Sequence, residues 1–383
     1  MNSKRVILVA NWDWVLHNFR MHLARRLQEE GYSVSFVCPP GDYVNGFADE
    51  DIRWIPWKVS RRGLNPIDEL QSIVSLAKIY MEEQPGIVHH STIKPNLYGT
   101  LAVHLNRLCA RFTSTPAVLN SFMGIGYVFS DHTLAQALRF IVVPLLRLAL
   151  NRSGVFTTFS NKADRQAFVD HEIVRTSNSG IYISEFVDTN TFRPGQSEDG
   201  RPIRVLMGAR LLWDKGVKEF VDTASNVDSK SSTDVEFWLA GDPDQGAPNY
   251  VPRKDIEEWV ENGTIRWLGH RSDMPELMRR VDIAFLPTHY NEGTPRFLVE
   301  AASTGLPLVS TATEACERVV RDGINGHVAP AKDVKAFTKA ILHLVENKDD
   351  RDAFGRHSRA LALNMYDKES NLDKWIDLYH SIR

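Results

Sequence analysis

The stretch that decides the fold is residues 291–311, Asn-Glu-Gly-Thr-Pro-Arg-Phe-Leu-Val-Glu-Ala-Ala-Ser-Thr-Gly-Leu-Pro-Leu-Val-Ser-Thr. It follows an apolar run at residues 281–287, which predicts a buried strand, and it ends in a second apolar run at residues 308–311. Between the two runs, Thr294 suits a helix N-cap and Pro295 suits the first helical position, where a missing N–H costs nothing. The order strand, polar loop, helix, strand predicts a parallel α/β sheet.

The loop and the start of this helix are suited to an anionic ligand, because free backbone N–H groups and the helix dipole favour negative charge. Two carboxylates flank this point. Glu292 lies in the loop, and Glu300 lies eight residues later in an otherwise apolar helix. A carboxylate in that position must be hydrogen-bonded or face a cleft. Sugar and ribose hydroxyl groups could donate hydrogen bonds to such a carboxylate.

The pair Glu292 and Glu300 stands within a longer pattern. It is followed by Ala-Ala-x-x-Gly-x-Pro and by Val-Arg-Asp-Gly-Ile-Asn-Gly at residues 320–326. The whole string resembles the donor-site signature of glycosyltransferase family 4, whose members are retaining enzymes of the GT-B fold. The resemblance implies an α/β protein of two Rossmann-like domains facing a cleft. It also implies a nucleotide sugar as co-substrate, with no cofactor and no metal. We expect a UDP-linked donor, and a GDP-linked donor is the alternative. The alternative is an ordinary strand–helix unit with two surface glutamates.

Length and charge agree with this organisation. The chain has 383 residues, and a single core rarely grows beyond ~250–300 residues. We expect an acceptor-binding domain over residues 1–188, a nucleotide-sugar-binding domain over 189–366, and a helix over 367–383 that crosses back to the first domain. A net charge of −3 without long charge runs argues against a nucleic-acid partner.

The sequence also predicts a cytoplasmic location. The three cysteines are scattered, which fits a reduced compartment, and no signal peptide precedes the first predicted strand. No uninterrupted apolar run reaches the ~20 residues needed to span a bilayer. The resemblance adds a peripheral position on the inner face of the cell membrane as an expectation.

A second motif, Gly-Ala-Arg-Leu-Leu-Trp-Asp-Lys-Gly, occupies residues 208–216 after a predicted strand. Arg210 and Lys215 are five residues apart and could converge on one pyrophosphate. Departure of a nucleoside diphosphate builds negative charge on it, and fixed cations there stabilise the transition state. Family 4 enzymes resemble this arrangement. The alternative is a pair of solvated charges in a loop.

We therefore expect Glu292, Arg210 and Lys215 to be the catalytic residues. The resemblance implies a set of donor-binding residues around two loops of the second domain, namely Gly293, Thr294, Pro295, Arg296, Glu300, Gly269, His270 and Arg271. Asp242 and Asp244 form an Asp-x-Asp that could hold a divalent cation, but we interpret Asp242 as a loop residue and expect no metal site.

Five residues of the first domain are candidates for the acceptor side of the cleft. Asn18 and Arg20 belong to an Asn-Phe-Arg that resembles a subgroup building bacterial surface and lipid-linked glycans, which includes N-acetylgalactosaminyltransferases of N-glycan assembly. Arg20 either meets an anionic acceptor or is a surface arginine. His90 and Lys94 follow a predicted strand over residues 87–90, and adjacent histidines on a strand point to opposite faces.

Gly124 lies in a glycine-bearing loop at residues 121–130 that could offer N–H groups to phosphates. Many family members carry Thr-x-His-Gly at this place, whereas this chain has Ser-Phe-Met-Gly at residues 121–124. The role of that histidine therefore does not transfer. The first predicted loop, residues 11–17, holds no glycine, so the GxGxxG fingerprint is absent, which argues against a dehydrogenase.

Residues 133–150 are rich in leucine and interrupted by few polar residues. The segment is too short and too charged to span a membrane. Two interpretations remain open: a helix buried in the core, and an amphipathic helix lying on a membrane surface.

The sequence thus predicts a retaining glycosyltransferase that moves a sugar from a nucleotide sugar to a lipid-linked or polysaccharide acceptor. Two alternatives remain. A nucleotide-sugar epimerase of the same architecture would turn over its substrate without an acceptor. A non-catalytic sugar-nucleotide or membrane-binding module would need fewer charged residues than this chain carries.

Overall fold

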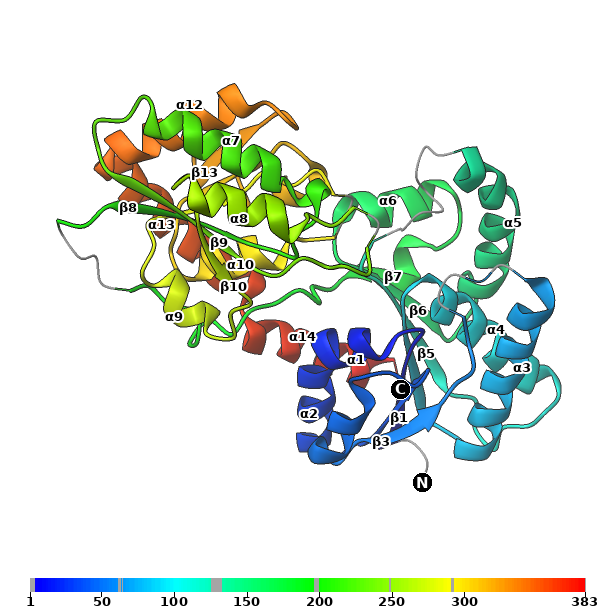
Figure 1. Cartoon of the computed structure of the whole chain (residues 1–383). Coiled ribbons are helices and arrows are strands. Elements are labelled where there is room, and N and C mark those ends of the chain that lie inside the picture. Colours follow the sequence, from blue (N-terminus) through cyan, green and yellow to red (C-terminus); the bar gives the residue numbers. More distant parts are fainter. Residues whose placement is uncertain are drawn as a thin grey trace. The chain divides into compact units, whose positions relative to one another are not determined.

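The computed structural model describes residues 4–60, 63, 65–124, 133–195, 200–247, 249–290 and 293–382, and for residues 133–138 the backbone alone. The chain divides into two compact units, which are described separately (Figure 1). The first unit consists of Met1–Ser184 with Glu369–Arg383, and the second of Glu185–Lys368. Both are α/β units built on a parallel sheet.

The first unit has a sheet of seven parallel strands in the order β3-β2-β1-β4-β5-β6-β7. Its strands are β1 (Arg5–Ala10), β2 (Ser33–Cys38), β3 (Arg53–Pro56), β4 (Ile87–Ser91), β5 (Ala117–Phe122), β6 (Val155–Phe159) and β7 (Ser179–Ile181). Its helices are α1 (Asp13–Phe19), α2 (Met21–Glu29), α3 (Pro66–Glu83), α4 (Ile93–Leu108), α5 (Thr133–Leu150), α6 (Lys162–Asp170) and α14 (Lys368–Ser381), with 3₁₀ turns at Val44–Glu50 and Thr176–Asn178.

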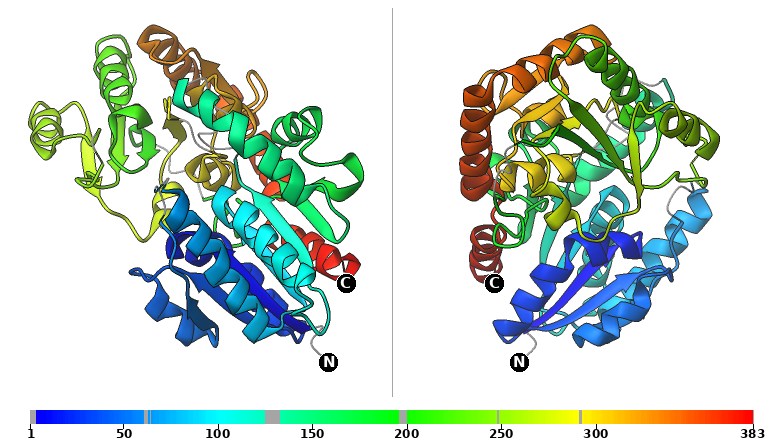
Figure 2. Two further views of the ribbon diagram at one scale, coloured as in Figure 1. Left: turned by 90° about the vertical axis from the view of Figure 1, so that its right-hand side faces the viewer. Right: turned by 60° about the vertical axis from the view of Figure 1, so that its left-hand side comes forward.

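Helices cover both faces of this sheet. α3, α4 and α5 lie side by side over one face, and α2 and α14 lie over the other (Figures 1 and 2). The central strands are apolar on both faces because both are covered, and all five residues from Val6 to Ala10 are buried. Leu76, Val103, Leu146 and Phe159 belong to the core of this unit.

The C-terminal helix α14 docks onto the first unit through specific polar contacts. The indole N–H of Trp375 donates to the carbonyl of Ile183 at 3.0 Å. The hydroxyl of Tyr379 lies 2.6 Å from Nδ1 of His89 on β4. Trp375 and Tyr379 are both buried, so the helix contributes to the core that it covers.

The second unit has a sheet of six parallel strands in the order β10-β9-β8-β11-β12-β13. Its strands are β8 (Ile203–Gly208), β9 (Val235–Ala240), β10 (Arg266–Gly269), β11 (Ile283–Leu286), β12 (Leu308–Thr311) and β13 (Gly326–Ala329). Its helices are α7 (Val217–Asp228), α8 (Arg253–Glu261), α9 (Met274–Met278), α10 (Arg296–Ser303), α11 (Glu314–Glu317), α12 (Val334–Glu346) and α13 (Lys348–Leu361), with a 3₁₀ turn η5 (Trp213–Lys215) and a π-helical turn (Ala362–Tyr366).

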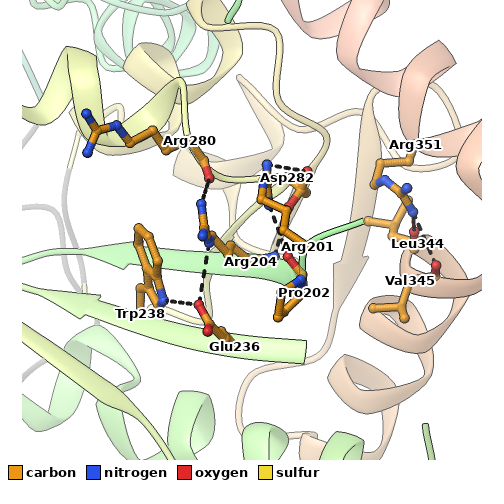
Figure 3. A network of polar contacts seen from close by, with 10 residues as sticks. All are labelled: Arg201, Pro202, Arg204, Glu236, Trp238, Arg280, Asp282, Leu344, Val345 and Arg351. Atoms are coloured by element: carbon orange, nitrogen blue, oxygen red, sulfur yellow. Dashed lines mark hydrogen bonds and ion pairs between the residues drawn. The ribbon is translucent and has the colours of Figure 1, made fainter. Parts of the chain in front are cut away.

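A polar network holds the amino end of this second sheet together (Figure 3). Arg201 forms a bidentate ion pair with Asp282, at 2.7 and 3.1 Å, and Asp282 also accepts from the backbone N–H of Arg204. The Arg204 guanidinium donates to the carbonyl of Arg280 and stacks over Trp238 at 4.7 Å. These contacts join β8 to β9 and to the segment before β11. The charges at this end therefore have partners within the protein.

Several expected element boundaries are wrong. Residues 11–17 are not all loop, since α1 begins at Asp13. Arg20, with a φ of −121°, lies outside the helices and separates α1 from α2. The connection after β4 is short, because α4 begins at Ile93.

The remaining differences lie at helix and strand ends. The N-cap of α10 is Pro295 and not Thr294, with no side-chain cap. The last strand of the first sheet, β7, ends at Ile181.

Gly99 on α4 is required by the packing of His90, and this gives a stability prediction. A Cβ at Gly99 would lie 2.1 Å from Nε2 of His90, whose ring is fixed by Tyr80 at 2.7 Å and Asn120 at 2.8 Å. We expect Gly99→Ala to lower the free energy of unfolding of the first unit by ~1–3 kcal/mol through overpacking. Gly46→Ala is the matched control, since nothing lies within 4 Å of its Cβ position. Thermal unfolding of both variants tests this, and equal midpoints would contradict it.

Candidate functional site

The candidate site of the second unit lies where the strand order reverses. β8 is central, with β9 on one side and β11 on the other, so the connections after β8 and β11 leave in opposite directions. In open parallel sheets this point forms a crevice at the carboxyl ends of the strands, where ligands bind. Arg210 and Lys215 follow β8, while Gly293, Thr294 and Pro295 follow β11. The fold thus places both motifs at one edge of one sheet.

Gly216 brings the two connections into contact. It has a φ of +84°, and a Cβ on it would lie 2.2 Å from the carbonyl oxygen of Pro287. The carbonyl of Asp214 accepts from the backbone N–H of His289 at 2.9 Å. Asp214 is itself held by Asn249, whose side-chain amide donates to it at 2.6 Å. Only glycine combines this backbone conformation with so close an approach.

Lys215 is a buried cation at this junction. Its residue is 8% exposed, and its Nζ lies 4.7 Å from the ring centroid of Tyr290, which follows β11. This is a cation–π contact across the two connections. The ammonium group is therefore positioned by tertiary contacts at the edge where a ligand of this fold class would bind.

Arg210 is in a different environment from Lys215. Its side chain is 57% exposed, and its guanidinium donates to Asp244 after β9 at 2.8 Å. Lys215 is thus fixed in the interior, whereas Arg210 lies at the surface and is paired with the Asp244 carboxylate. A phosphate could replace that carboxylate with little rearrangement of the main chain.

Glu300 is the described member of the expected carboxylate pair, because Glu292 lies outside the described residues. The Glu300 side chain is 13% exposed and accepts from Nε of Arg296 at 2.8 Å. Burial raises the pKa of the Glu300 carboxyl above its ordinary value, although the arginine opposes this shift. Gly293 is half-buried, and Thr294 and Pro295 are buried at the start of α10.

The loop after β10 is the third connection at this edge. Gly269 has a φ of +64°, and its carbonyl accepts from the N–H of Gly241 at 2.8 Å. His270 is exposed. The Arg271 side chain pairs with Asp273, which lowers the pKa of that carboxyl. Gly269 and His270 are therefore the members of this loop that a ligand could reach without breaking an ion pair.

In the first unit the structure does not support the acceptor role expected for Arg20. The residue is 1% exposed, and its guanidinium donates to the hydroxyls of Ser91 at 2.9 Å and Ser184 at 3.0 Å. It also lies 5.4 Å from the ring of Trp375 on α14. Arg20 is thus an interior residue that joins the connection between α1 and α2 to β4 and to the C-terminal helix.

His90 and Lys94 are also engaged within the protein. His90 is fully buried, with one ring nitrogen on Tyr80 and the other on Asn120, which makes it a core histidine. His89 points to the opposite face, as the strand period predicts, and contacts Tyr379. The Lys94 ammonium donates to Glu69 at 2.6 Å and to the carbonyls of Ser60 and Gly63. It therefore anchors the segment before α3.

Asn18 and Gly124 could each still contact an acceptor, as expected from the sequence. The amide of Asn18 donates to the Trp14 carbonyl at 2.9 Å, which leaves its oxygen available. Gly124 is exposed, and nothing lies within 4 Å of its Cβ position.

Sequence reasoning missed an aromatic surface after β1. Trp12 and Trp14 stack with ring centroids 4.8 Å apart and planes 22° apart, and both are half-buried. Beside them, Thr92 adopts a φ of +76°, which is unusual for a β-branched residue, and its hydroxyl donates to Asn11 at 2.8 Å. This edge lies between β1 and β4, where the order of the first sheet reverses. Trp12 and Trp14, two tryptophans within three residues of each other, were the sequence signal that could have predicted this surface.

Within the part of the chain that the structure describes, no group of three or more His, Cys, Asp or Glu could hold a metal ion. Of the described helices, none has both the length and the apolar character needed to cross a bilayer.

Each of the two units matches a known protein family. The family model "Glycosyl transferase 4-like" matches residues 5–160, and the model "Glycosyl transferases group 1" matches residues 202–347. The chain belongs to these glycosyltransferases. The two matches follow the two units, and together they cover most of the chain. The expected resemblance to glycosyltransferase family 4 is confirmed.

Two curated relatives align with this glycosyltransferase over nearly its whole length. The N,N'-diacetylbacillosaminyl-diphospho-undecaprenol alpha-1,3-N-acetylgalactosaminyltransferase of Campylobacter jejuni is 27% identical over 380 residues, covering 96% of each chain. The UDP-Gal:alpha-D-GlcNAc-diphosphoundecaprenol alpha-1,3-galactosyltransferase of Escherichia coli is 21% identical and covers 92% of this chain and 90% of its own.

Solved structures show the same fold. HepE of Anabaena in complex with UDP aligns with a TM-score of 0.79 at 16% identity, over 99% of this chain and 100% of its own. A glycosyltransferase from Rickettsia africae aligns with a TM-score of 0.78 at 16% identity, over 100% and 99%. The expected GT-B fold class, two Rossmann-like domains, is confirmed.

Gly216 gives a prediction for the candidate site. We expect Gly216→Ala to lower the thermal midpoint of the second unit and to weaken ligand binding at this edge, because the new Cβ must push the Pro287 carbonyl away. Gly263→Ala is the matched control. It also has a positive φ, of +72°, but nothing lies within 4 Å of its Cβ position. Equal losses in both variants would indicate that backbone strain, and not the contact, is responsible.

The two buried histidines give a pH prediction. Burial lowers the pKa of His90 from 6.5 to about 4, and it also lowers the pKa of His89. The folded state then binds fewer protons than the unfolded state, so the stabilisation is present above pH 6.5 and is lost as the pH falls toward about 4. For His90 the loss is up to about 3 kcal/mol. Urea unfolding of the first unit across this range measures it, and His90→Gln should show a shallower decline.

Proposed function

We propose that this glycosyltransferase transfers a sugar, with retention of anomeric configuration and without a metal ion, from a UDP-sugar to a lipid-linked acceptor of a bacterial surface glycan. The observation that carries the proposal is Lys215, a buried cation at the strand-order reversal of the second unit. The Anabaena HepE structure that shares the fold holds UDP. The names of the Campylobacter jejuni and Escherichia coli relatives describe acceptors linked to diphospho-undecaprenol.

In the proposed reaction, the bond between the anomeric carbon and the β-phosphate oxygen breaks, and a bond to the acceptor oxygen forms on the same face. Negative charge then collects on the departing diphosphate. Lys215 stabilises this charge from a fixed position, and Arg210 exchanges Asp244 for a phosphate oxygen. The acceptor hydroxyl gives its proton to the leaving phosphate, so no enzymic base is required.

The helix start and its carboxylates hold the remainder of the donor. Backbone N–H groups at Gly293 and Thr294 are close to the start of α10, where anions are favoured. Glu300, in its partly buried position, accepts from the ribose hydroxyls in place of Arg296. Glu292 is assigned to the sugar hydroxyls through the family resemblance. Gly269 and His270 supply contacts to the base.

On the acceptor side we assign the aromatic surface of Trp12 and Trp14. A sugar ring presents an apolar C–H face that stacks on an indole, and two stacked indoles give a broad surface for it. Asn18 and Gly124 supply polar contacts at the same end of the sheet. Arg20, His90 and Lys94 are left out of this assignment because each is engaged within the protein.

The test is isothermal titration of the purified protein with UDP, in the presence of a chelator and then with magnesium. We expect binding without metal, and we expect Lys215→Ala to raise the Kd at least ~10-fold, which corresponds to about 1.4 kcal/mol. Lys218→Ala is the matched control, since Lys218 is an exposed residue of the same segment and pairs with Asp222.

Other outcomes of this titration would each change a different part of the proposal. A requirement for magnesium would overturn metal independence, and preference for GDP would change the donor class. Absence of nucleotide binding would overturn the proposed function. Turnover of a UDP-sugar without any acceptor would favour an epimerase.

A further inference from the structure

The helix α5 carries an apolar face that the protein does not cover. Its inner face is buried in the core through Val143, Leu146, Ala149 and Leu150. Its outer face exposes a second set of apolar side chains, Phe140, Ile141, Pro144, Leu145 and Leu148. At 100° per residue these five positions fall on one side of the helix, opposite the buried set. Phe140 is 83% exposed and Ile141 64%. The core interpretation of this helix is thus confirmed for one face, and the other face is exposed.

The neighbouring helices extend this surface. α4 packs against both α3 and α5, and the three lie side by side on one face of the sheet (Figure 2, left). α4 adds Leu108, which is 86% exposed, in line with the half-buried Leu101 and Leu105. α3 adds Ile67, Leu70 and Val74 at helical spacing, all exposed. We call the exposed apolar residues of these three helices the outer helical face. Isolated exposed apolar residues are common, whereas a set spread over three adjacent helices marks an interaction surface.

The charge around this face indicates what it contacts. The whole chain has a net charge of −3, yet residues 84–163 hold a single acidic residue, Asp131. The same segment, which includes α4 and α5, holds seven basic residues: Lys94, Arg107, Arg111, Arg139, Arg147, Arg152 and Lys162.

On α3, Glu69 is paired with Lys94 and Glu83 with Arg53, so the acidic residues there are partly neutralised. An apolar face with a basic surround complements an anionic lipid surface.

We propose that the outer helical face of the first unit binds the surface of a membrane rich in anionic phospholipids. The apolar side chains of α3, α4 and α5 enter the boundary between headgroups and acyl chains, and the exposed Arg107 of α4 and Arg147 of α5 contact the lipid phosphates. The helices lie along the surface and do not cross it, which agrees with the composition of α5. This proposal goes beyond the proposed function and does not depend on it, because vesicle binding is measured without any sugar transfer.

The experiment is co-sedimentation of the full chain with vesicles of phosphatidylglycerol and phosphatidylethanolamine, compared with vesicles of phosphatidylcholine. We expect partition onto the anionic vesicles that weakens as salt rises from 50 to 500 mM, because exposed charges are screened. The double variant Phe140→Glu with Ile141→Glu should lower the partition coefficient at least ~10-fold, since two charges replace two inserted side chains.

The matched control is Val260→Glu with Ile324→Glu, which places two charges at exposed apolar positions of the second unit. It should bind vesicles as the unaltered chain does. Circular dichroism and thermal unfolding establish that both double variants fold. UDP titration of the same samples separates this proposal from the proposed function, since an altered outer helical face should leave UDP affinity unchanged.

Two results would overturn the proposal. One is the absence of partition onto anionic vesicles above the phosphatidylcholine level. The other is equal partition of the α5 variant and the unaltered chain. If the unaltered chain fails to bind vesicles and sediments as a dimer that the α5 variant dissociates, the face pairs two copies of this chain instead.

Discussion

The contact between Gly216 and the carbonyl of Pro287 is the constraint on which the candidate donor site depends. Strand order alone brings the ends of β8 and β11 to the same edge, but the connections after them could still lie apart. Their main chains meet because residue 216 has no Cβ and adopts a positive φ. Asp214 and His289 then form a backbone hydrogen bond, and Lys215 lies against Tyr290. A flexible lysine is thereby fixed before any ligand arrives, which reduces the conformational entropy lost on binding.

The two cations of this site come from one sequence motif but lie in different environments. Lys215 is buried and held by tertiary packing, so in the proposed reaction it acts on the departing diphosphate from a set position. Arg210 is exposed and paired with Asp244, so it can change partners as a ligand enters. The first unit shows the opposite case, in which reactive side chains serve structural contacts. Arg20, His89 and His90 are chemically versatile, yet hydrogen bonds to Ser91, Tyr379 and Asn120 commit them to the interior and to the docking of α14.

The first unit combines an aromatic sheet edge with an apolar outer surface. Trp12 and Trp14 lie at the carboxyl end of its sheet, while the outer helical face covers one side of the same sheet. A glycosyltransferase with the lipid-linked acceptor proposed above needs both a site for the sugar head of that acceptor and a way to remain near the lipid. Placing the two on one rigid unit fixes the distance between them, because the sheet and the helices α3, α4 and α5 share a core.

The sequence by itself determined the α/β class, the presence of two Rossmann-like domains, the family, and the strands at residues 87–90, 281–287 and 308–311 to within two residues. It could do so because buried parallel strands are short apolar runs and because the motif of residues 291–311 is local. Element ends were less certain, as at Asp13 and Pro295, where capping depends on a few contacts. Only the tertiary structure decided which polar residues face solvent. Arg20, His90 and Lys94 occupy positions typical of a ligand site, but partners distant in sequence, Ser184, Tyr80 and Glu69, place them in the interior. Such pairings arise from packing between elements, which no local pattern encodes.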